Sequence, residues 1–364
     1  MMFQTYFVYV GTVLLSCLFS FFATRSKTKY HRYFWVFSII LLLTLITGFR
    51  STTVGRDSNG YATNYESQTL KWYEPGFTFL QKILFLINPN YTFFFTVVAF
   101  FTNFCIVWRL FDFNGKSNGA SFVFCIFCFV ATSFTVGFNG MRQWLAVAIC
   151  FYATRYFFND NKPKIIPYIL LNAIGISIHY SAIAILILLI PVLLSKTKNR
   201  KLQVLRSLSV LAIIAGIFLG LYFFKERSYD KLLNPSKFEF GFMVIFKSLV
   251  IILIAFNFKL EKSDRNGELF LSKGLINYQY GWVILTECLY VALSSLSYGF
   301  EVLGRIAWYF ELFETLFFAN ILSRRTNSLA VWASRFLIIV IIVTKFTGNF
   351  SVEEMRSPYL FFWQ

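Results

Sequence analysis

The chain has 364 residues, of which 57% are hydrophobic and only 14% are charged, whereas about 25% of the residues of a soluble domain are charged. This composition excludes an ordinary soluble domain and indicates an integral membrane protein. The net charge of +17 does not indicate nucleic-acid binding, because the basic residues lie in short segments between apolar runs, where the positive-inside rule places them.

Apolar runs recur along the chain. A run of about 20 residues crosses the hydrocarbon core as a helix, and the runs are continuous rather than alternating, which excludes a β-barrel. We therefore predict an all-α, polytopic transmembrane bundle of about 11 or 12 spans, forming a single domain over residues 1–364. The predicted spans lie near residues 5–23, 33–50, 91–111, 120–137, 141–158, 165–194, 207–224, 241–259, 280–299, 306–323 and 329–347.

The basic segments between the spans predict the orientation. The segments from Arg25 to Arg32 and from Lys196 to Arg206 are rich in Lys and Arg, so both should face the cytoplasm. The apolar stretch 165–194 must then go out and back, as a re-entrant or short-helix hairpin that turns near residues 178–181. A single long, tilted span is the alternative, and it would invert every later segment. The hairpin places both termini outside.

With this orientation, unusual polar residues gather at the outer boundary of the membrane. They are Arg50, Arg56, Asp57, Glu74, Arg142, His179 and Arg305. A snorkelling side chain explains any one arginine, but several cations from different segments would form an anion site. Guanidinium groups suit phosphate because they stay charged and offer paired donors. Arg142 would also lie in the first turn of its helix, and a helix N-terminus favours a phosphate.

The longest outer loop covers about residues 50–90. Within it, residues 77–88 carry apolar side chains at Phe77, Leu80, Leu84 and Ile87, with Gln81 and Lys82 between them. This spacing predicts an amphipathic surface helix or a re-entrant segment that packs over the bundle.

His179 is the sole histidine in an apolar stretch. The ordinary explanation is a hydrogen-bonded structural residue, but its position at the hairpin tip, facing Arg142, also fits a proton acceptor. Asp57 and Glu74 are alternative proton acceptors.

Four ionisable residues, Lys247, Glu287, Glu311 and Glu314, fall inside predicted spans and need partners there. They fit a proton relay or a buried pairing that fixes the bundle, and we favour the pairing. The cysteines, including Cys125 and Cys128, lie in or beside apolar runs without a polar neighbourhood that would lower a thiol pKa. We expect neither a metal site nor a cofactor.

Four short motifs occur in an order and spacing that resemble the EpsG-type polysaccharide polymerases, relatives of the Wzy polymerases. The first is Phe49-Arg50 with Val54-Gly55-Arg56-Asp57-Ser58-Asn59-Gly60-Tyr61 and Glu74-Pro75-Gly76-Phe77, which resembles the first outer loop of that family. The others are Met141-Arg142-Gln143-Trp144, His179-Tyr180-Ser181 and Arg305-Ile306-Ala307-Trp308-Tyr309-Phe310. Many relatives read Gly-Thr-Asp-Tyr where this chain has Gly55-Arg56-Asp57-Ser58, so Arg56 is an added cation.

The resemblance implies a metal-independent glycosyltransferase that polymerises oligosaccharide units linked to undecaprenyl diphosphate into O-antigen, capsule or exopolysaccharide. The protein would lie in the bacterial inner membrane with its active face outside, working with a flippase and a chain-length regulator of the same pathway. The proton acceptor would be His179 or Asp57. The residues that bind the diphosphate and the sugar would be Arg50, Arg56, Glu74, Arg142, Gln143, Arg305 and Tyr309.

Two other functions fit the same sequence features. A flippase or another transporter for lipid-linked oligosaccharides would use Glu287, Glu311 and Glu314 at mid-membrane. An O-antigen ligase-type transferase would share the lipid diphosphate donor and therefore the arginines.

Overall fold

The computed structural model describes residues 2–69, 73–114, 119–156, 164–188, 246–251, 283, 286–294, 301–323, 329–350 and 358–364. Most of these residues are helical, which confirms the predicted all-α class. The predicted span at 207–224, most of the span at 241–259 and the basic segment from Lys196 to Arg206 lie outside the described residues.

Four described helices are long and apolar enough to cross a membrane. They are α1 (Met2–Arg25), α2 (Lys29–Gly48), α5 (Tyr91–Asn114) and α15 (Leu329–Gly348), and each matches a predicted span. The shorter α6 (Gly119–Thr132) and α7 (Val136–Asn139) replace the predicted span at 120–137, because the chain turns at residues 133–135. The span predicted at 141–158 is α8 (Met141–Ala153), followed by the 3₁₀ turn η1 (Thr154–Tyr156).

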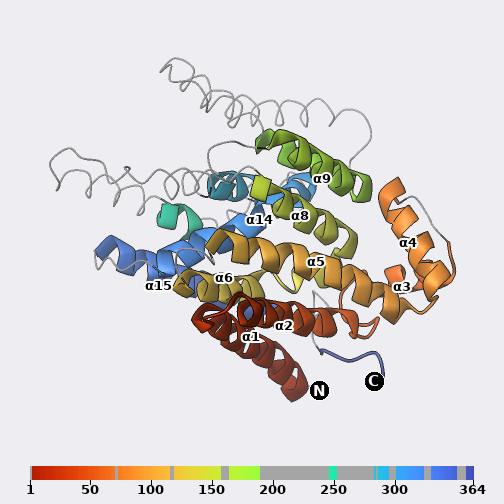
Figure 1. The fold of residues 1–364 in the computed structure, drawn as a ribbon, viewed down its shortest axis with the longest axis horizontal. Helices are drawn as coiled ribbons and strands as arrows, with labels where there is room; N and C mark the ends of the chain where they lie inside the picture. The colour runs from red at the N-terminus through yellow and green to blue at the C-terminus, as the bar shows by residue number, and fades with distance from the viewer. Residues whose placement is uncertain are drawn as a thin grey trace, which may run out of the picture.

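The helices stack side by side in an order that differs from their order in the chain (Figure 1). The helix α2 packs between α1 and α5, and α8 packs between α5 and α9 (Ile165–Ile178). The outermost helix α1 turns large apolar side chains away from the bundle, among them Phe3, Phe7 and Leu14. Because apolar side chains are stable in contact with lipid tails, this exposed surface fits a bilayer.

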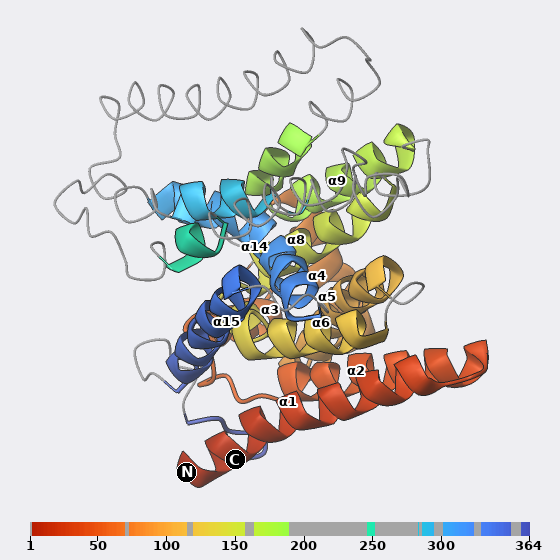
Figure 2. The same ribbon diagram turned by 90° about the vertical axis from the view of Figure 1, so that its left-hand side faces the viewer.

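The helix α14 (Glu301–Leu322) lies in the interior of the bundle, where α6, α8 and α15 pack around it (Figure 2). It begins before the predicted span at 306–323, and its residues from 309 to 319 are all buried. A helix that is buried on all sides can carry polar side chains only where neighbouring helices supply partners.

The predicted hairpin is present over residues 165–188. The helix α9 ends at Ile178, the chain turns at His179, and the 3₁₀ helix η2 (Tyr180–Leu188) packs back against α9. The Tyr168 hydroxyl donates a hydrogen bond to the carbonyl of Ile185 at 3.0 Å, which ties the two arms together. The alternative of one long, tilted span is therefore wrong for these residues, while residues 189–194 lie outside the described part of the chain.

The first outer loop contains two helices, α3 (Ser58–Glu66) and α4 (Pro75–Ile87). The predicted amphipathic helix is α4, which packs on α9 and buries Phe77 and Leu84. It also buries Gln81, which the sequence pattern placed on the polar side, and exposes the predicted core residue Ile87. The loop thus carries a helix that covers the end of the hairpin.

Residues 358–364 fold back onto the first loop. The N–H of Ser51 donates to the carbonyl of Leu360 at 2.9 Å, and the N–H of Phe362 donates to the carbonyl of Phe49 at 2.8 Å. The N–H of Tyr359 also donates to the Thr5 hydroxyl of α1 at 2.9 Å. Both ends of the described chain therefore lie on the same face of the bundle as the first loop (Figure 1).

Gly55 fixes the first loop against the turn before α8. Its φ of 96° is in the left-handed region, and a Cβ there would collide with the carbonyl of Phe138 and the hydroxyl of Ser58. This close approach places Arg56 and Asp57 beside the start of α8, because the Arg56 N–H donates to the Asn139 side-chain carbonyl at 2.8 Å.

We predict that Gly55→Ala lowers the apparent melting temperature of the detergent-solubilised protein. The strained backbone should cost at least about 1–2 kcal/mol. The matched control is Gly60→Ala, because a Cβ at this helical position meets no atom within 4 Å. An equal loss of stability in both variants would contradict the role assigned to Gly55.

Candidate active site

A cavity of about 800 Å³ opens between the first loop, α8, the hairpin tip and α14. Six of the residues predicted for the site line it: Arg56, Asp57, Arg142, Gln143, His179 and Arg305. They come from four segments that are far apart in the sequence. Among the described residues of its wall, four cationic side chains accompany two carboxylates, since Lys345 and Glu311 also line the cavity. A cavity of this size is typical of a small-molecule site.

Arg142 is held in place by Glu74. Its guanidinium group lies 2.5 Å from the Glu74 carboxylate and 4.8 Å from the centre of the Tyr73 ring. The other carboxylate oxygen of Glu74 accepts a hydrogen bond from the backbone N–H of Tyr180 at 3.1 Å. Glu74 itself is buried behind the cavity wall. It therefore joins the first loop, α8 and the hairpin tip, and it orients Arg142 toward the cavity.

His179 is the first member of a short chain of hydrogen bonds. Its Nδ1 lies 2.6 Å from the Ser181 hydroxyl, which donates to the Tyr309 hydroxyl at 3.2 Å. The Ser181 hydroxyl can donate to Nδ1 or accept from it, so this contact fits either tautomer of the imidazole. Burial and the Arg142 guanidinium lower the pKa of His179 to about 4, although Glu74 acts in the opposite direction. The imidazole is thus neutral near pH 7.

Two further contacts set the wall between α8 and α14. The Gln143 side-chain amide donates to the carbonyl of Arg305 at 2.6 Å, which fixes Gln143 beside the start of α14. Gly140 allows the Trp308 ring to approach, since a Cβ at that position would lie 2.6 Å from a ring carbon. Tyr309 is buried behind the wall and acts on the site through Ser181.

Arg50 does not line the cavity. Its guanidinium is fully buried, lies over the rings of Phe95 and Phe138, and donates to the backbone carbonyls of Thr47 and Val54. Burial lowers the pKa of Arg50 to about 10, so the side chain is still charged at neutral pH. These contacts hold the first loop in place, and they keep the Arg50 side chain away from the cavity that the other predicted arginines line.

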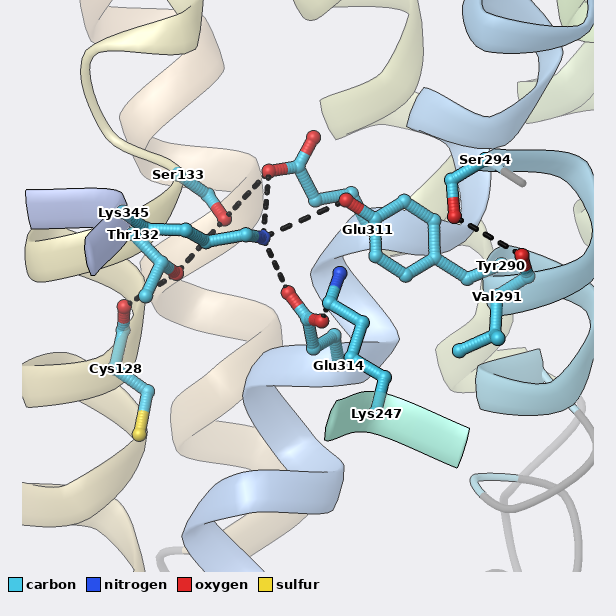
Figure 3. Close-up of polar contacts among 10 residues, drawn as sticks. All are labelled: Cys128, Thr132, Ser133, Lys247, Tyr290, Val291, Ser294, Glu311, Glu314 and Lys345. Carbon is cyan, nitrogen blue, oxygen red and sulfur yellow. Dashed lines mark hydrogen bonds and ion pairs between the residues drawn. The ribbon is translucent and has the colours of Figure 1, made fainter. Parts of the chain in front are cut away.

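A network of ion pairs lies at the inner end of the cavity (Figure 3). Glu314 forms ion pairs with Lys247 and Lys345, each at 2.5 Å, and Lys345 is 3.5 Å from Glu311. The favoured prediction of buried pairing is confirmed for Lys247, Glu311 and Glu314. Neither carboxylate oxygen of Glu287 has a hydrogen-bond partner among the described residues.

The sequence did not identify Trp308, Glu311 and Lys345 as cavity residues. The signal on α14 is the spacing of Gly304, Trp308 and Glu311, which fall at i, i+4 and i+7 and therefore share one helix face. Lys345 carries no such signal, because its position in the wall depends on how α15 packs against α14. Among the described residues, no group of three or more His, Cys, Asp or Glu side chains could hold a metal ion.

The family comparison agrees with the motifs. The profile described as the EpsG family matches residues 32–361, which include every segment that lines the cavity. The chain belongs to the EpsG family. No curated protein and no solved structure matches it. Membership of the EpsG family, together with the apolar helices, indicates a multi-pass membrane protein of the polysaccharide-polymerase type.

We predict that His179 makes the stability of this EpsG-family protein depend on pH. Its pKa is about 4 in the folded chain against an ordinary value of 6.5, so the unfolded chain binds the proton more readily. Stability from this group is present above pH 6.5 and is lost as the pH falls toward 4.

The apparent melting temperature should therefore fall between pH 7 and pH 4.5, and the fall should be smaller in His179→Gln. His31→Gln changes the exposed histidine at the start of α2 and should keep the wild-type slope. A His179→Gln protein with the full wild-type slope would rule out this contribution.

Proposed function

We propose that the protein is a glycosyltransferase that polymerises oligosaccharide repeat units carried on undecaprenyl diphosphate, at the outer face of the bacterial cytoplasmic membrane. The observation that carries the proposal is the convergence of Arg56, Arg142 and Arg305 on one cavity. Membership of the EpsG family supports the same reaction class.

The cations suit the leaving group of this reaction. A hydroxyl oxygen of one repeat unit attacks the anomeric carbon of the chain on the second carrier, and a new glycosidic bond forms. The bond between that carbon and the diphosphate oxygen breaks, and the diphosphate leaves with the electron pair. Arginines placed where this charge develops would stabilise the transition state, and the N-terminus of α8 beside Arg142 adds its positive dipole.

The proton of the attacking hydroxyl needs an acceptor. His179 is the better placed candidate, because it is neutral near pH 7 and its Nε2 takes no part in the contact with Ser181. Asp57 lines the same cavity and is the alternative acceptor. We propose one of these two side chains, His179 or Asp57, as the acceptor of a proton that moves late in the reaction.

Glu74 would compete with the diphosphate of the donor for Arg142. Without substrate, the Glu74 carboxylate neutralises Arg142 at 2.5 Å. A diphosphate that entered the cavity would share this arginine, so binding would depend on the combined charge of all the cations in the wall rather than on one. This arrangement would favour release of the free carrier once the sugar has been transferred.

We predict that Arg142→Ala lowers the polymerisation rate on the order of 100-fold, the loss expected when one charge-stabilising donor is removed. The measurement is the surface-glycan profile of a deletion strain that expresses wild type or variant at equal protein level. The ladder of long chains should collapse to single repeat units in the deletion strain, and Arg142→Ala should fail to restore it.

The matched control is Arg155→Ala. Arg155 follows the opposite end of α8, pairs with Asp112 at 3.0 Å and lies outside the cavity wall. It should restore long chains. If Arg142→Ala restored wild-type chains, the diphosphate role would be wrong, and if the deletion removed all surface glycan, transport would replace polymerisation as the function.

A further inference from the structure

The inner end of the cavity carries a group that the proposed reaction has not used. Glu311 lies six residues after Arg305 on α14, which is about 9 Å deeper along the helix axis. The residue is only 5% exposed, yet it belongs to the cavity wall together with Tyr290 and Lys345. A buried carboxylate that faces a cavity is costly unless it has partners.

One of the two carboxylate oxygens of Glu311 has partners. One oxygen accepts a hydrogen bond from the Ser133 hydroxyl at 3.1 Å and lies 3.5 Å from the Lys345 ammonium. The other oxygen makes no contact among the residues drawn in Figure 3, where it points away from both Ser133 and Lys345. As far as the described residues go, one acceptor oxygen is therefore left for a donor inside the cavity.

Lys345 is engaged by the other members of this network. Its ammonium group has three donors, and it faces Glu314 at 2.5 Å, Glu311 at 3.5 Å and the Tyr290 hydroxyl at 3.5 Å. Glu314 is in turn fixed by Lys247 at 2.5 Å. The network thus holds the Glu311 carboxylate in one orientation, and Lys345 and Ser133 are positioning residues.

We infer that Glu311 contacts the saccharide of the substrate: its unpartnered oxygen accepts a hydrogen bond from a sugar hydroxyl at the floor of the cavity. This inference rests on the proposed function. The ligand is an uncharged, hydroxyl-bearing sugar unit, because a carboxylate accepts from hydroxyl groups and repels anions. Arginines at the rim and a carboxylate at the floor would orient the substrate with its diphosphate outward and its sugar inward.

The test measures binding of two probes to the purified full-length protein in lipid nanodiscs. Inorganic diphosphate reports on the arginines at the rim. The oligosaccharide released by partial hydrolysis of the polysaccharide that the source organism makes reports on the floor. Glu311→Gln should bind the oligosaccharide about 10- to 100-fold more weakly, as expected for a lost hydrogen bond to a charged group, and should bind diphosphate as wild type does.

Two more variants make the result specific. Ser133→Ala keeps every charge but removes one contact that orients Glu311, and it should weaken oligosaccharide binding by roughly 3- to 10-fold. Glu287→Gln makes the same chemical change as Glu311→Gln at a buried carboxylate outside the cavity wall, and it should bind both probes as wild type does.

The outcomes separate the inference from the proposed function. Wild-type oligosaccharide affinity in Glu311→Gln, or an equal loss in Glu287→Gln, would overturn the role of Glu311 and leave the proposed polymerase intact. A wild-type protein that binds diphosphate but no oligosaccharide would also overturn the inference. If wild type bound neither probe, the proposed function itself would fail. A melting curve for each variant verifies that the compared proteins are folded.

Discussion

The carboxylate of Glu74 joins three segments that are far apart in the sequence. It pairs with Arg142 at the start of α8 and accepts a hydrogen bond from the backbone N–H of Tyr180 at the hairpin tip, while Glu74 itself directly precedes α4 of the first loop. Because the ion pair is largely buried, removing either partner would leave an uncompensated charge, which typically costs about 3–5 kcal/mol. The geometry of the cavity rim, including the position of His179 next to Arg142, depends on this single group.

At the floor of the cavity, as at the rim, buried charges need partners. Ionisable residues inside a bundle require partners, and Glu314 is the shared partner of Lys247 and Lys345, each at 2.5 Å. Glu311 belongs to this network and also lines the cavity, and its second oxygen contacts none of the residues drawn in Figure 3. The arginines of the rim gather positive charge, whereas the lysines and glutamates of the floor pair with one another, so the two ends of the cavity differ in charge along α14. Such a gradient would distinguish the two ends of a substrate that is anionic at one end and uncharged at the other.

Particular residues mark what the sequence could predict. The apolar runs located α1, α2, α5 and α15 because a bilayer requires long helices, and the basic segments predicted the turn at His179. The motifs of the EpsG family predicted Arg142, His179 and Arg305 for one site, and all three line the same cavity. Arg50 belonged to the same motifs but is buried between two rings, since motif and charge alone do not show which way a side chain points. Lys345 required the packing of α15, which no local pattern encodes.

The contacts of residues 358–364 have a consequence for biosynthesis. The Tyr359 hydroxyl donates to the carbonyl of Ile46, 313 positions earlier in the chain, and Leu360 and Phe362 pair with residues 49–51. The ribosome therefore makes the first loop long before its partners exist, and domains form in the order in which they are synthesised. A nascent chain could insert its early helices but could not give the loop that carries Arg56 and Asp57 its final shape. The cavity would take its final shape only after residues 358–364 have been synthesised, so a chain that stops before residue 358 would insert its helices into the membrane without a fully formed first loop.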